Sequence, residues 1–217
     1  MQAYGQTEAS PIITLNPPES HVGEGRRLGR LRAAGRASYS TQVRIEGPQG
    51  HELPRGQVGE ICARGPNVML GYWNRPEETA HALRGGWLHT GDGGYMDEDG
   101  FVFVVDRLKD MVVSGGENVY SAEVENAARQ HPSVADCAVI GIPSVRWGES
   151  VHIAVVLKPH ARLDLEALQA HCRTLIAGYK VPRSMEVLSA LPLSPVGKVL
   201  KTTLRQPYWG GTGRAVN

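Results

Sequence analysis

Two short stretches combine residue types that suit nucleotide chemistry. In Tyr4-Gly5-Gln6-Thr7-Glu8, a tyrosine can stack on a planar base, a threonine hydroxyl can meet a phosphate, and a glutamate is a hard oxygen ligand for magnesium. In Thr90-Gly91-Asp92, the carboxylate can accept hydrogen bonds from two adjacent ribose hydroxyls, and Arg107 can add donors to the same sugar or phosphate. Alone, each stretch is equally compatible with an ordinary loop or a capped turn.

Two glycine-containing segments add candidates in the second half of the chain. Gly115 and Gly116 follow Ser114 and supply a turn whose backbone can take positive φ angles and approach a ligand closely. Lys198 follows a glycine, but the surrounding residues do not fit the GxxxxGK[ST] phosphate loop. On local evidence, a solvated surface lysine is therefore the simpler interpretation of Lys198.

Composition limits the classes of partner. The 217 residues carry 23 basic and 22 acidic side chains, a net charge of +1, which gives no bulk electrostatic reason to expect nucleic acid or an anionic membrane. No apolar stretch approaches the roughly twenty residues of a transmembrane helix, and no signal peptide is recognisable. The three cysteines form no CxxC pair and the eight histidines no HExxH motif, so neither a zinc site nor a disulfide framework is indicated. A reducing cytoplasm is the simplest setting.

The elements of the first half are mostly strands. Residues 41–46 alternate polar and apolar side chains and precede a glycine-rich turn, residues 58–63 form another strand, and residues 101–105 form an apolar run that stops at Asp106. A short helix is expected to open at Asn74 as its N-cap, with Pro76 in its first turn, and to end at Gly85-Gly86. This pattern predicts a small distorted barrel or an antiparallel sheet.

The second half mixes helices and strands. Strands are expected at residues 111–113, 134–142 and 151–157, the last two paired antiparallel, with one helix capped by Ser121 and another from Leu165 to a C-cap at Gly178. The predicted fold class is α+β. We expect residues 1–106 to be the β-rich end of a larger N-terminal domain, 107–109 a hinge, 110–205 a small mobile α+β domain, and 206–217 a tail.

The motifs also occur together in a recognisable order. The chain resembles the carboxyl-terminal part of the AMP-forming acyl-CoA synthetases, within the adenylate-forming superfamily that also includes aryl-CoA ligases, luciferases and peptide-synthetase adenylation domains. The resemblance extends from about Ala3 to Arg205. It rests on YGQTE, GEICARGPNVMLGYWNRPEET, WLHTGDGGYMDEDGF, DRLKDMVVSGGENVYSAEVE, WGE and SPVGK.

The resemblance implies a two-step reaction. Such enzymes attack the α-phosphate of ATP with a substrate carboxylate, release pyrophosphate, and then let the thiol of coenzyme A displace AMP. Transferred by position, the family's roles give catalytic residues Lys198, Thr7 and Glu8, with Glu8 binding Mg²⁺ and Thr7 contacting phosphate. Tyr4 would border adenine, and Gly5 would also belong to the cofactor-binding residues. Asp92 and Arg107 would hold the ribose, Gly115 and Gly116 would face the pantetheine channel, and Lys109 would be the hinge about which the small domain rotates.

One part of the family pattern is absent. The Ser/Thr/Gly-rich phosphate loop and the acyl-binding pocket precede YGQTE in the family, so we expect a fragment that is inactive without the N-terminal part of the same enzyme. The expected substrates are a small carboxylic acid, fatty or aryl, with ATP and coenzyme A. Two alternatives remain: a non-catalytic module that binds nucleotide, coenzyme A or another protein, and an adenylation domain that loads a carrier protein.

Overall fold

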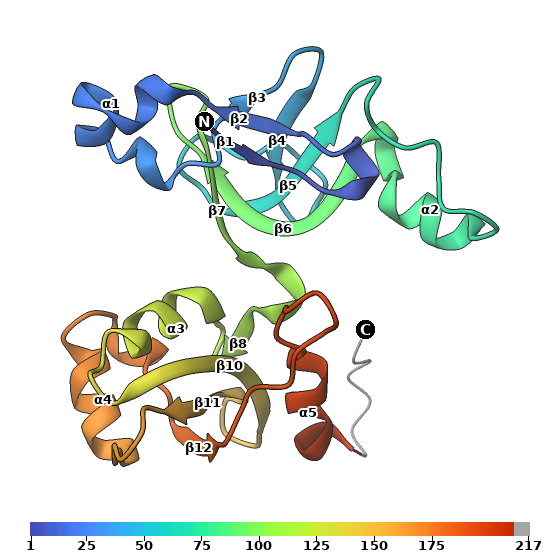
Figure 1. Ribbon diagram of the computed structural model, residues 1–217. Coiled ribbons are helices and arrows are strands. Elements are labelled where there is room, and N and C mark those ends of the chain that lie inside the picture. Colours follow the sequence, from blue (N-terminus) through green and yellow to red (C-terminus); the bar gives the residue numbers. More distant parts are fainter. Residues whose placement is uncertain (211–217) are drawn as a thin grey trace. The chain divides into compact units, whose positions relative to one another are not determined.

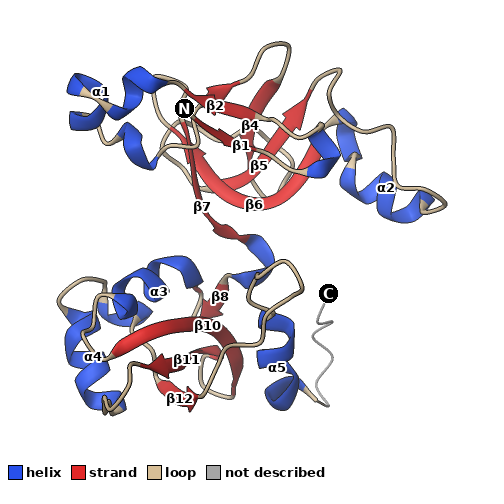
Figure 2. Cartoon of the chain, viewed as in Figure 1, coloured by secondary structure: helices blue, strands red, loops and turns tan. Residues whose placement is uncertain are grey.

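The chain folds into two compact units. The computed structural model describes residues 1–210, and the boundary between the units lies between Leu108 and Lys109 (Figure 1). Each unit has its own sheets and its own hydrophobic core, and strands are mixed with helices in both (Figure 2). The predicted α+β class is therefore confirmed.

The N-terminal unit is built from two antiparallel sheets. A three-stranded sheet has the order β1-β2-β3 and a four-stranded sheet the order β4-β5-β6-β7. Within the described residues the second sheet does not close, so of the two expected alternatives the antiparallel sheet is right and the barrel is wrong. The elements are β1 (Gln2–Tyr4), β2 (Thr14–Asn16), α1 (Gly23–Arg27), β3 (Arg36–Ala37), β4 (Gln42–Glu46), β5 (Gly59–Arg64), α2 (Pro76–Ala82), β6 (Leu88–Met96) and β7 (Val102–Arg107).

The alternation of side chains explains how the four-stranded sheet buries one face. Ile45 on β4 lies opposite Ile61 on β5, and both are buried in a core with Met96 and Val102. The apolar run was expected to stop at Asp106, but strand β7 continues to Arg107, because Arg107 still pairs with Asp92 of β6.

The C-terminal unit is one mixed sheet covered on both faces. The strand order is β10-β11-β8-β9, with β12 parallel to β11, and β10 and β11 pair antiparallel as expected. The elements are β8 (Val112–Ser114), β9 (Glu117–Val119), α3 (Ser121–Arg129), β10 (Val134–Ser144), β11 (Gly148–Leu157), α4 (Leu165–Arg173), β12 (Ser184–Leu188) and α5 (Lys201–Trp209).

Alternate residues of β10 enter two different cores. Val139 is buried with residues of α3 and α4, whereas Ile140 is buried on the other face with Leu204 of α5. Helices α3 and α4 therefore cover one face of the sheet and α5 covers the other (Figure 1). Fully burying a leucine contributes roughly 1.5–3 kcal/mol, so Leu204 is a principal anchor of α5.

Three predicted helix caps are wrong. The N-cap of α2 is Arg75 rather than Asn74, which instead takes a positive φ of 54° that asparagine tolerates. Ser121 is the first residue of α3, after the N-cap Tyr120, and its hydroxyl accepts a hydrogen bond from Lys201. Helix α4 ends at Arg173, so Gly178 lies beyond its C-cap.

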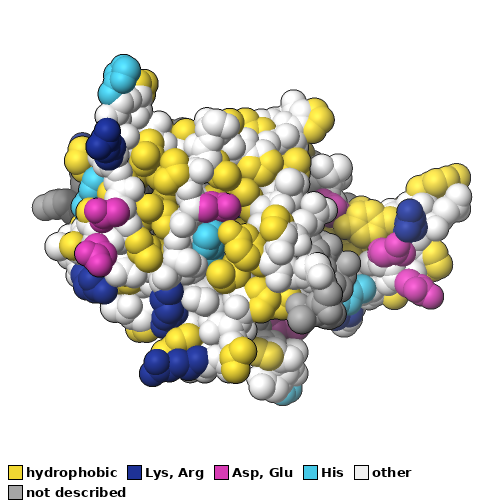
Figure 3. Space-filling view, turned by 90° about the horizontal axis from the view of Figure 1, so that it is seen from below, with side chains coloured by type: hydrophobic (Ala, Val, Ile, Leu, Met, Phe, Trp, Pro, Cys, Tyr) yellow, Lys and Arg dark blue, Asp and Glu magenta, His cyan; other side chains and the backbone are white. Residues whose placement is uncertain are grey.

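The end of the chain contains structure that the sequence did not reveal. Strand β12 and helix α5 were not predicted, and α5 continues to Trp209, into the segment expected to be a tail. The rest of that tail, 211–217, lies outside the described residues. Within the described part, no helix combines the length and apolar character needed to span a bilayer. On the face seen in Figure 3, charged side chains lie in several separate places among hydrophobic and uncharged groups.

Candidate functional site

The structure brings three of the predicted residues together in the N-terminal unit. Asp92 on β6 lies opposite Arg107 on β7, and Tyr4 ends β1. The Tyr4 hydroxyl donates a hydrogen bond of 2.7 Å to Oδ2 of Asp92. The guanidinium Nε of Arg107 lies 3.8 Å from Oδ1 of the same carboxylate. The two oxygens of Asp92 therefore face different partners.

Burial sets the protonation behaviour of this cluster. It raises the pKa of the Asp92 carboxyl, against the lowering effects of the Tyr4 hydrogen bond and the Arg107 charge. Burial, followed by the charge of Asp92, also raises the pKa of Tyr4 well above its usual range. Tyr4 thus stays a protonated donor, and its hydroxyl is committed to Asp92. The aromatic ring of Tyr4 remains available to stack on a planar base.

The segment after Tyr4 is fixed by close backbone packing. A Cβ on Gly5 would lie 1.8 Å from the carbonyl oxygen of Pro11, so only glycine fits there. A short 3-10 helix, Thr7–Ala9, follows and leaves the Thr7 side chain exposed. Oε1 of Glu8 accepts a hydrogen bond of 2.9 Å from the hydroxyl of Tyr72, and burial and this contact raise the pKa of Tyr72.

These side chains have the chemistry that a magnesium-bound nucleotide needs. Glu8 offers one hard carboxylate, and magnesium typically takes one or two protein carboxylates together with phosphate oxygens and waters. Asp92 offers an acceptor for hydroxyl groups and Arg107, whose side chain is 54% exposed, offers donors. The residues present therefore fit ATP with Mg²⁺.

The Gly115-Gly116 turn belongs to the C-terminal unit and joins β8 to β9. Both residues have positive φ angles, 64° and 85°. A Cβ on Gly115 would lie 2.9 Å from the ring of Trp147, whose carbonyl also accepts a 2.8 Å hydrogen bond from the Gly115 amide. Gly115 is therefore required by packing against Trp147, whereas a Cβ on Gly116 would meet open space.

Trp147 is itself held by two cations. The guanidinium groups of Arg146 and Arg183 lie 4.5 and 4.9 Å from the centre of its ring. Arg183 also donates to the hydroxyl of Ser114, the residue before the glycine turn. The sequence did not indicate this support, because Arg183 and Ser114 lie far from Trp147 along the chain.

Lys109 and Lys198 are also residues of the C-terminal unit. Lys109 is exposed and lies in the 3-10 turn Leu108–Asp110. Lys198 is exposed on a tight turn in which the Ser194 amide donates to the Lys198 carbonyl at 2.8 Å and the Lys198 amide donates to the Ser194 hydroxyl at 3.1 Å. The turn fixes the backbone of Lys198 and leaves its side chain in solvent.

A buried polar cluster on β4, β5 and β6 was not predicted. Ligand-type atoms of Glu46, Cys62 and His89 lie within 4.8 Å of one another. Nδ1 of His89 is 2.8 Å from the Glu60 carboxylate and 3.4 Å from the Cys62 sulfur. Burial and the two nearby carboxylates raise the pKa of the Cys62 thiol. No motif signalled the cluster, because three different strands supply it.

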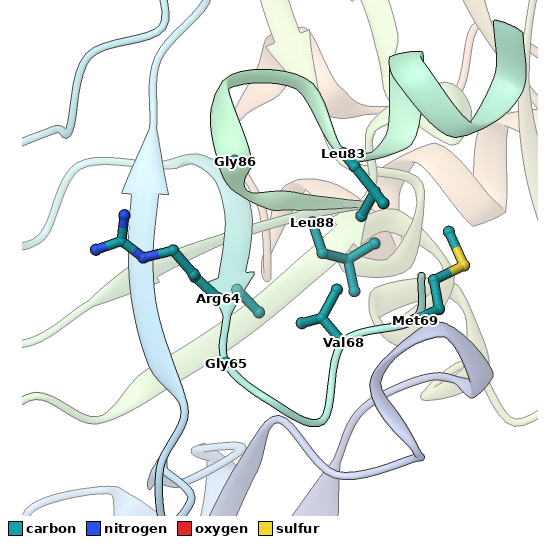
Figure 4. A pocket seen from close by; sticks show the side chains of 8 residues that line it. Arg64, Gly65, Val68, Met69, Leu83, Gly86 and Leu88 are labelled. Carbon is teal, nitrogen blue, oxygen red and sulfur yellow. The ribbon is translucent and has the colours of Figure 1, made fainter. Parts of the chain in front are cut away.

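The N-terminal unit also has an apolar pocket of about 230 Å³. Val68, Met69, Leu83 and Leu88 lie around it, and the guanidinium of Arg64 points away from them (Figure 4). None of the predicted site residues lines this pocket, so it is separate from the cluster around Asp92.

Comparisons with known proteins agree with the motifs. Residues 1–73 match the family model of the AMP-binding enzymes, and residues 123–198 match that of the AMP-binding enzyme C-terminal domain. A feruloyl-CoA synthase of Amycolatopsis sp is 49% identical over 96% of this chain and 41% of that protein. The fatty acid–[acyl-carrier-protein] ligase ScoC of Streptomyces coeruleorubidus is 42% identical over 100% of this chain and 41% of its own length.

A solved structure shows the same relationship. The o-succinylbenzoate coenzyme A synthetase MenE of Bacillus subtilis, in complex with ATP and magnesium ion, superposes with a TM-score of 0.83 and 37% identity, over 94% of this chain and 40% of that one. The chain thus spans about two fifths of the length of the relatives it matches. The chain belongs to the adenylate-forming AMP-binding enzymes.

Proposed function

We propose that this chain carries the nucleotide-holding residues and the adenylation lysine of an AMP-forming acid–thiol ligase. The observation that supports this most strongly is the Tyr4–Asp92–Arg107 cluster, in which a half-buried carboxylate is held by a tyrosine and faced by an arginine. Such a carboxylate is suited to accept hydrogen bonds from the ribose hydroxyls of ATP. The family of the chain supplies the reaction class.

The remaining nucleotide contacts follow from the neighbouring segment. Tyr4 and Gly5 border the adenine, Thr7 contacts phosphate, and Glu8 holds Mg²⁺, whose charge offsets that of the phosphates when it is bound. Tyr72 orients the Glu8 carboxylate through its 2.9 Å hydrogen bond.

Lys198 acts on the first bond change. A carboxylate oxygen of the acid forms a bond to the α-phosphorus, and the bond from that phosphorus to pyrophosphate breaks. Negative charge gathers between the two reactants, and the ammonium of Lys198 stabilises it; preorganised electrostatic stabilisation of this kind contributes about 3–4 kcal/mol per donor.

The second bond change releases AMP. The thiol sulfur of coenzyme A attacks the acyl carbon, and the bond from that carbon to the AMP oxygen breaks. In this step the Gly115-Gly116 turn borders the pantetheine arm. Rotation of the C-terminal unit about Lys109 withdraws Lys198 from the reacting atoms and brings this turn to them. Trp147 supports the turn from behind by its contact with Gly115.

The names of the relatives guide the choice of acid and acceptor. The named relatives act on a ferulic and on a fatty acyl group, and one of them is named for an acyl-carrier protein. We therefore propose an aryl or fatty acid as substrate, coenzyme A as acceptor, and a carrier protein as the alternative acceptor. Because this chain covers about two fifths of those relatives, turnover requires the N-terminal part of the same enzyme.

Pyrophosphate release tests the proposal. ATP, Mg²⁺, coenzyme A and a panel of fatty and aryl acids are given to this chain alone and to the chain joined to the N-terminal part that its relatives have. We expect release only from the joined protein, with the fastest acid naming the substrate. No release from either protein would favour a non-catalytic module, and release from this chain alone would contradict the role given to the missing part.

A parallel assay decides the acceptor. The joined protein is offered coenzyme A or a carrier protein bearing phosphopantetheine, and acyl transfer to each is measured. Faster transfer to coenzyme A supports the proposal, and faster transfer to the carrier supports the alternative.

A further inference from the structure

Helix α5 connects the turn that carries Lys198 with the segment that follows Lys109. It begins three residues after Lys198, and three residues span at most about 10 Å, so the position of α5 limits where the Lys198 turn can be. The helix packs Leu204 against Ile140 and Ala154 of the sheet. The Lys198 turn and α5 therefore form one structural element.

The same helix holds the residue that follows the pivot. Nη2 of Arg205 lies 2.9 Å from Oδ1 of Asp110, and the two side chains are only 8% and 13% exposed. Asp110 is the next residue after Lys109, and it is 95 positions from Arg205 in the sequence. Nearly buried charges are costly unless paired, so this contact is strongly preferred over separation.

A second ion pair fixes the start of α5. Nζ of Lys201 is 2.7 Å from Oε1 of Glu125 and donates to the hydroxyl of Ser121 at 2.6 Å. The same Glu125 oxygen accepts a hydrogen bond from the amide of Val139. Helix α5 is thus tied to α3 and β10 at its first turn and to residue 110 one turn later.

We propose that Arg205 is a positioning residue that fixes the chain after the pivot to the element carrying Lys198. The Arg205–Asp110 pair makes residue 110, α5 and the Lys198 turn move as one rigid body, so that backbone rotation is confined to Leu108 and Lys109. The inference rests on the proposed function, because that function requires the C-terminal unit to rotate about Lys109, and the pair determines which residues take part in the rotation. Without the pair, backbone rotation would spread from Leu108 and Lys109 into residues 110–112, and the orientation that the Lys198 turn reaches would be less sharply defined.

Hydrogen exchange of the 217-residue chain tests this directly. The variants are Arg205→Gln, Asp110→Asn and the double variant, and the control is Lys180→Gln. The control removes the ion pair of Lys180 with Glu123, which lies in the same unit and does not involve residue 110. Mass spectrometry follows peptides covering residues 109–114, 199–204 and, as a reference, 134–157.

We expect selective loosening in the three Arg205 and Asp110 variants. Exchange should be at least about tenfold faster in 109–114 and 199–204, since local opening of these segments becomes easier, and unchanged in 134–157. The double variant should be no looser than either single variant, because each single variant also leaves one nearly buried charge without its partner and the double variant leaves none. Equal acceleration in all three regions would mean that the pair only stabilises the unit, and an effect no larger than that of Lys180→Gln would also overturn the inference.

Two further measurements keep the outcome decisive. Should Arg205→Gln not fold by circular dichroism, Arg205→Lys keeps the charge but not the guanidinium geometry, and the same local acceleration is required of it. Pyrophosphate release by the joined protein with the native sequence is measured in parallel. If no pyrophosphate is released, the proposed function is refuted. The exchange result still decides whether Arg205 and Asp110 anchor α5.

Discussion

Tyr4 and Asp92 are 88 positions apart in the sequence and share a hydrogen bond of 2.7 Å between the phenol and the carboxylate. This bond joins β1 of one sheet to β6 of the other. It fixes one oxygen of a half-buried carboxylate and leaves the second facing Arg107. The nucleotide site proposed above depends on that division.

Replacing Tyr4 by Phe should weaken both the fold and the site. The change removes a donor from a largely buried carboxylate, and such an unsatisfied group costs about 1–3 kcal/mol. Urea unfolding of the chain measures the loss, and AMP titration of the joined protein measures the affinity. Tyr39→Phe is the control, since Tyr39 is fully exposed. Unchanged stability and affinity would contradict the role assigned to the hydroxyl.

The raised pKa of Asp92 predicts a specific pH dependence of stability. Its carboxyl binds a proton more tightly in the folded chain than in the unfolded chain, so stability falls as the pH rises from the ordinary carboxyl value through the raised one. Asp92→Asn keeps an acceptor for Tyr4 and removes this titration. The difference in unfolding free energy between the variant and the native chain should therefore favour the variant more at pH 7 than at pH 4, as measured by urea unfolding. The same change should lower the nucleotide affinity of the joined protein. An unaltered pH profile would show that Asp92 does not titrate in this way.

Replacing Lys198 by Ala should stop adenylate formation without affecting the fold. Removal of one preorganised donor typically slows the chemical step about 10²–10³-fold, whereas exposed substitutions change stability by less than about 0.5 kcal/mol. Pyrophosphate release by the joined protein and thermal unfolding of the chain are the two readouts. Lys158→Ala is the control, because Lys158 is another exposed lysine of the same unit. Equal rates in the two variants would exclude Lys198 as the adenylation lysine.

The two glycines of the β8–β9 turn should respond differently to alanine. Both have positive φ angles, which cost a residue with a Cβ about 1–2 kcal/mol. Gly115→Ala must in addition displace the Trp147 ring, 2.9 Å from the new Cβ, whereas Gly116→Ala meets no atom within 4 Å. Gly115→Ala should therefore be the less stable variant in urea unfolding and should quench or shift Trp147 fluorescence. The reverse order of stability would contradict the packing role of Gly115.

Side-chain periodicity predicted most of the central strands. Ile45 alternates with the polar neighbours Arg44 and Glu46, and the apolar runs of β10 and β11 are long enough to identify. Strand β12 and helix α5 were missed. β12 is only five residues long and only partly buried, so its alternation from Ser184 to Val187 is too short to stand out from the surrounding loop. Helix α5 begins without a side-chain cap and contains Pro207, which removes the usual helix signals.

The candidate site was predictable in its members but not in its geometry. The order of the motifs named Tyr4, Asp92 and Arg107, and the structure brings these three together. Sequence could not show that Tyr72 holds Glu8 or that Trp147 packs on Gly115, because those contacts join distant segments. Caps failed for a related reason: whether Asn74 or Ser121 caps a helix depends on backbone angles that residue type alone does not determine.

The position of α5 has a consequence for synthesis of the protein on the ribosome. The apolar face formed by Ala138, Ile140 and Ala154 is complete once β11 has been made, but Leu204 covers it only after the last described helix has emerged. Until then a nascent chain displays an apolar sheet surface, which invites association with other chains or with chaperones. A premature stop codon before Lys201 would make that transient exposure permanent, and such a product should aggregate.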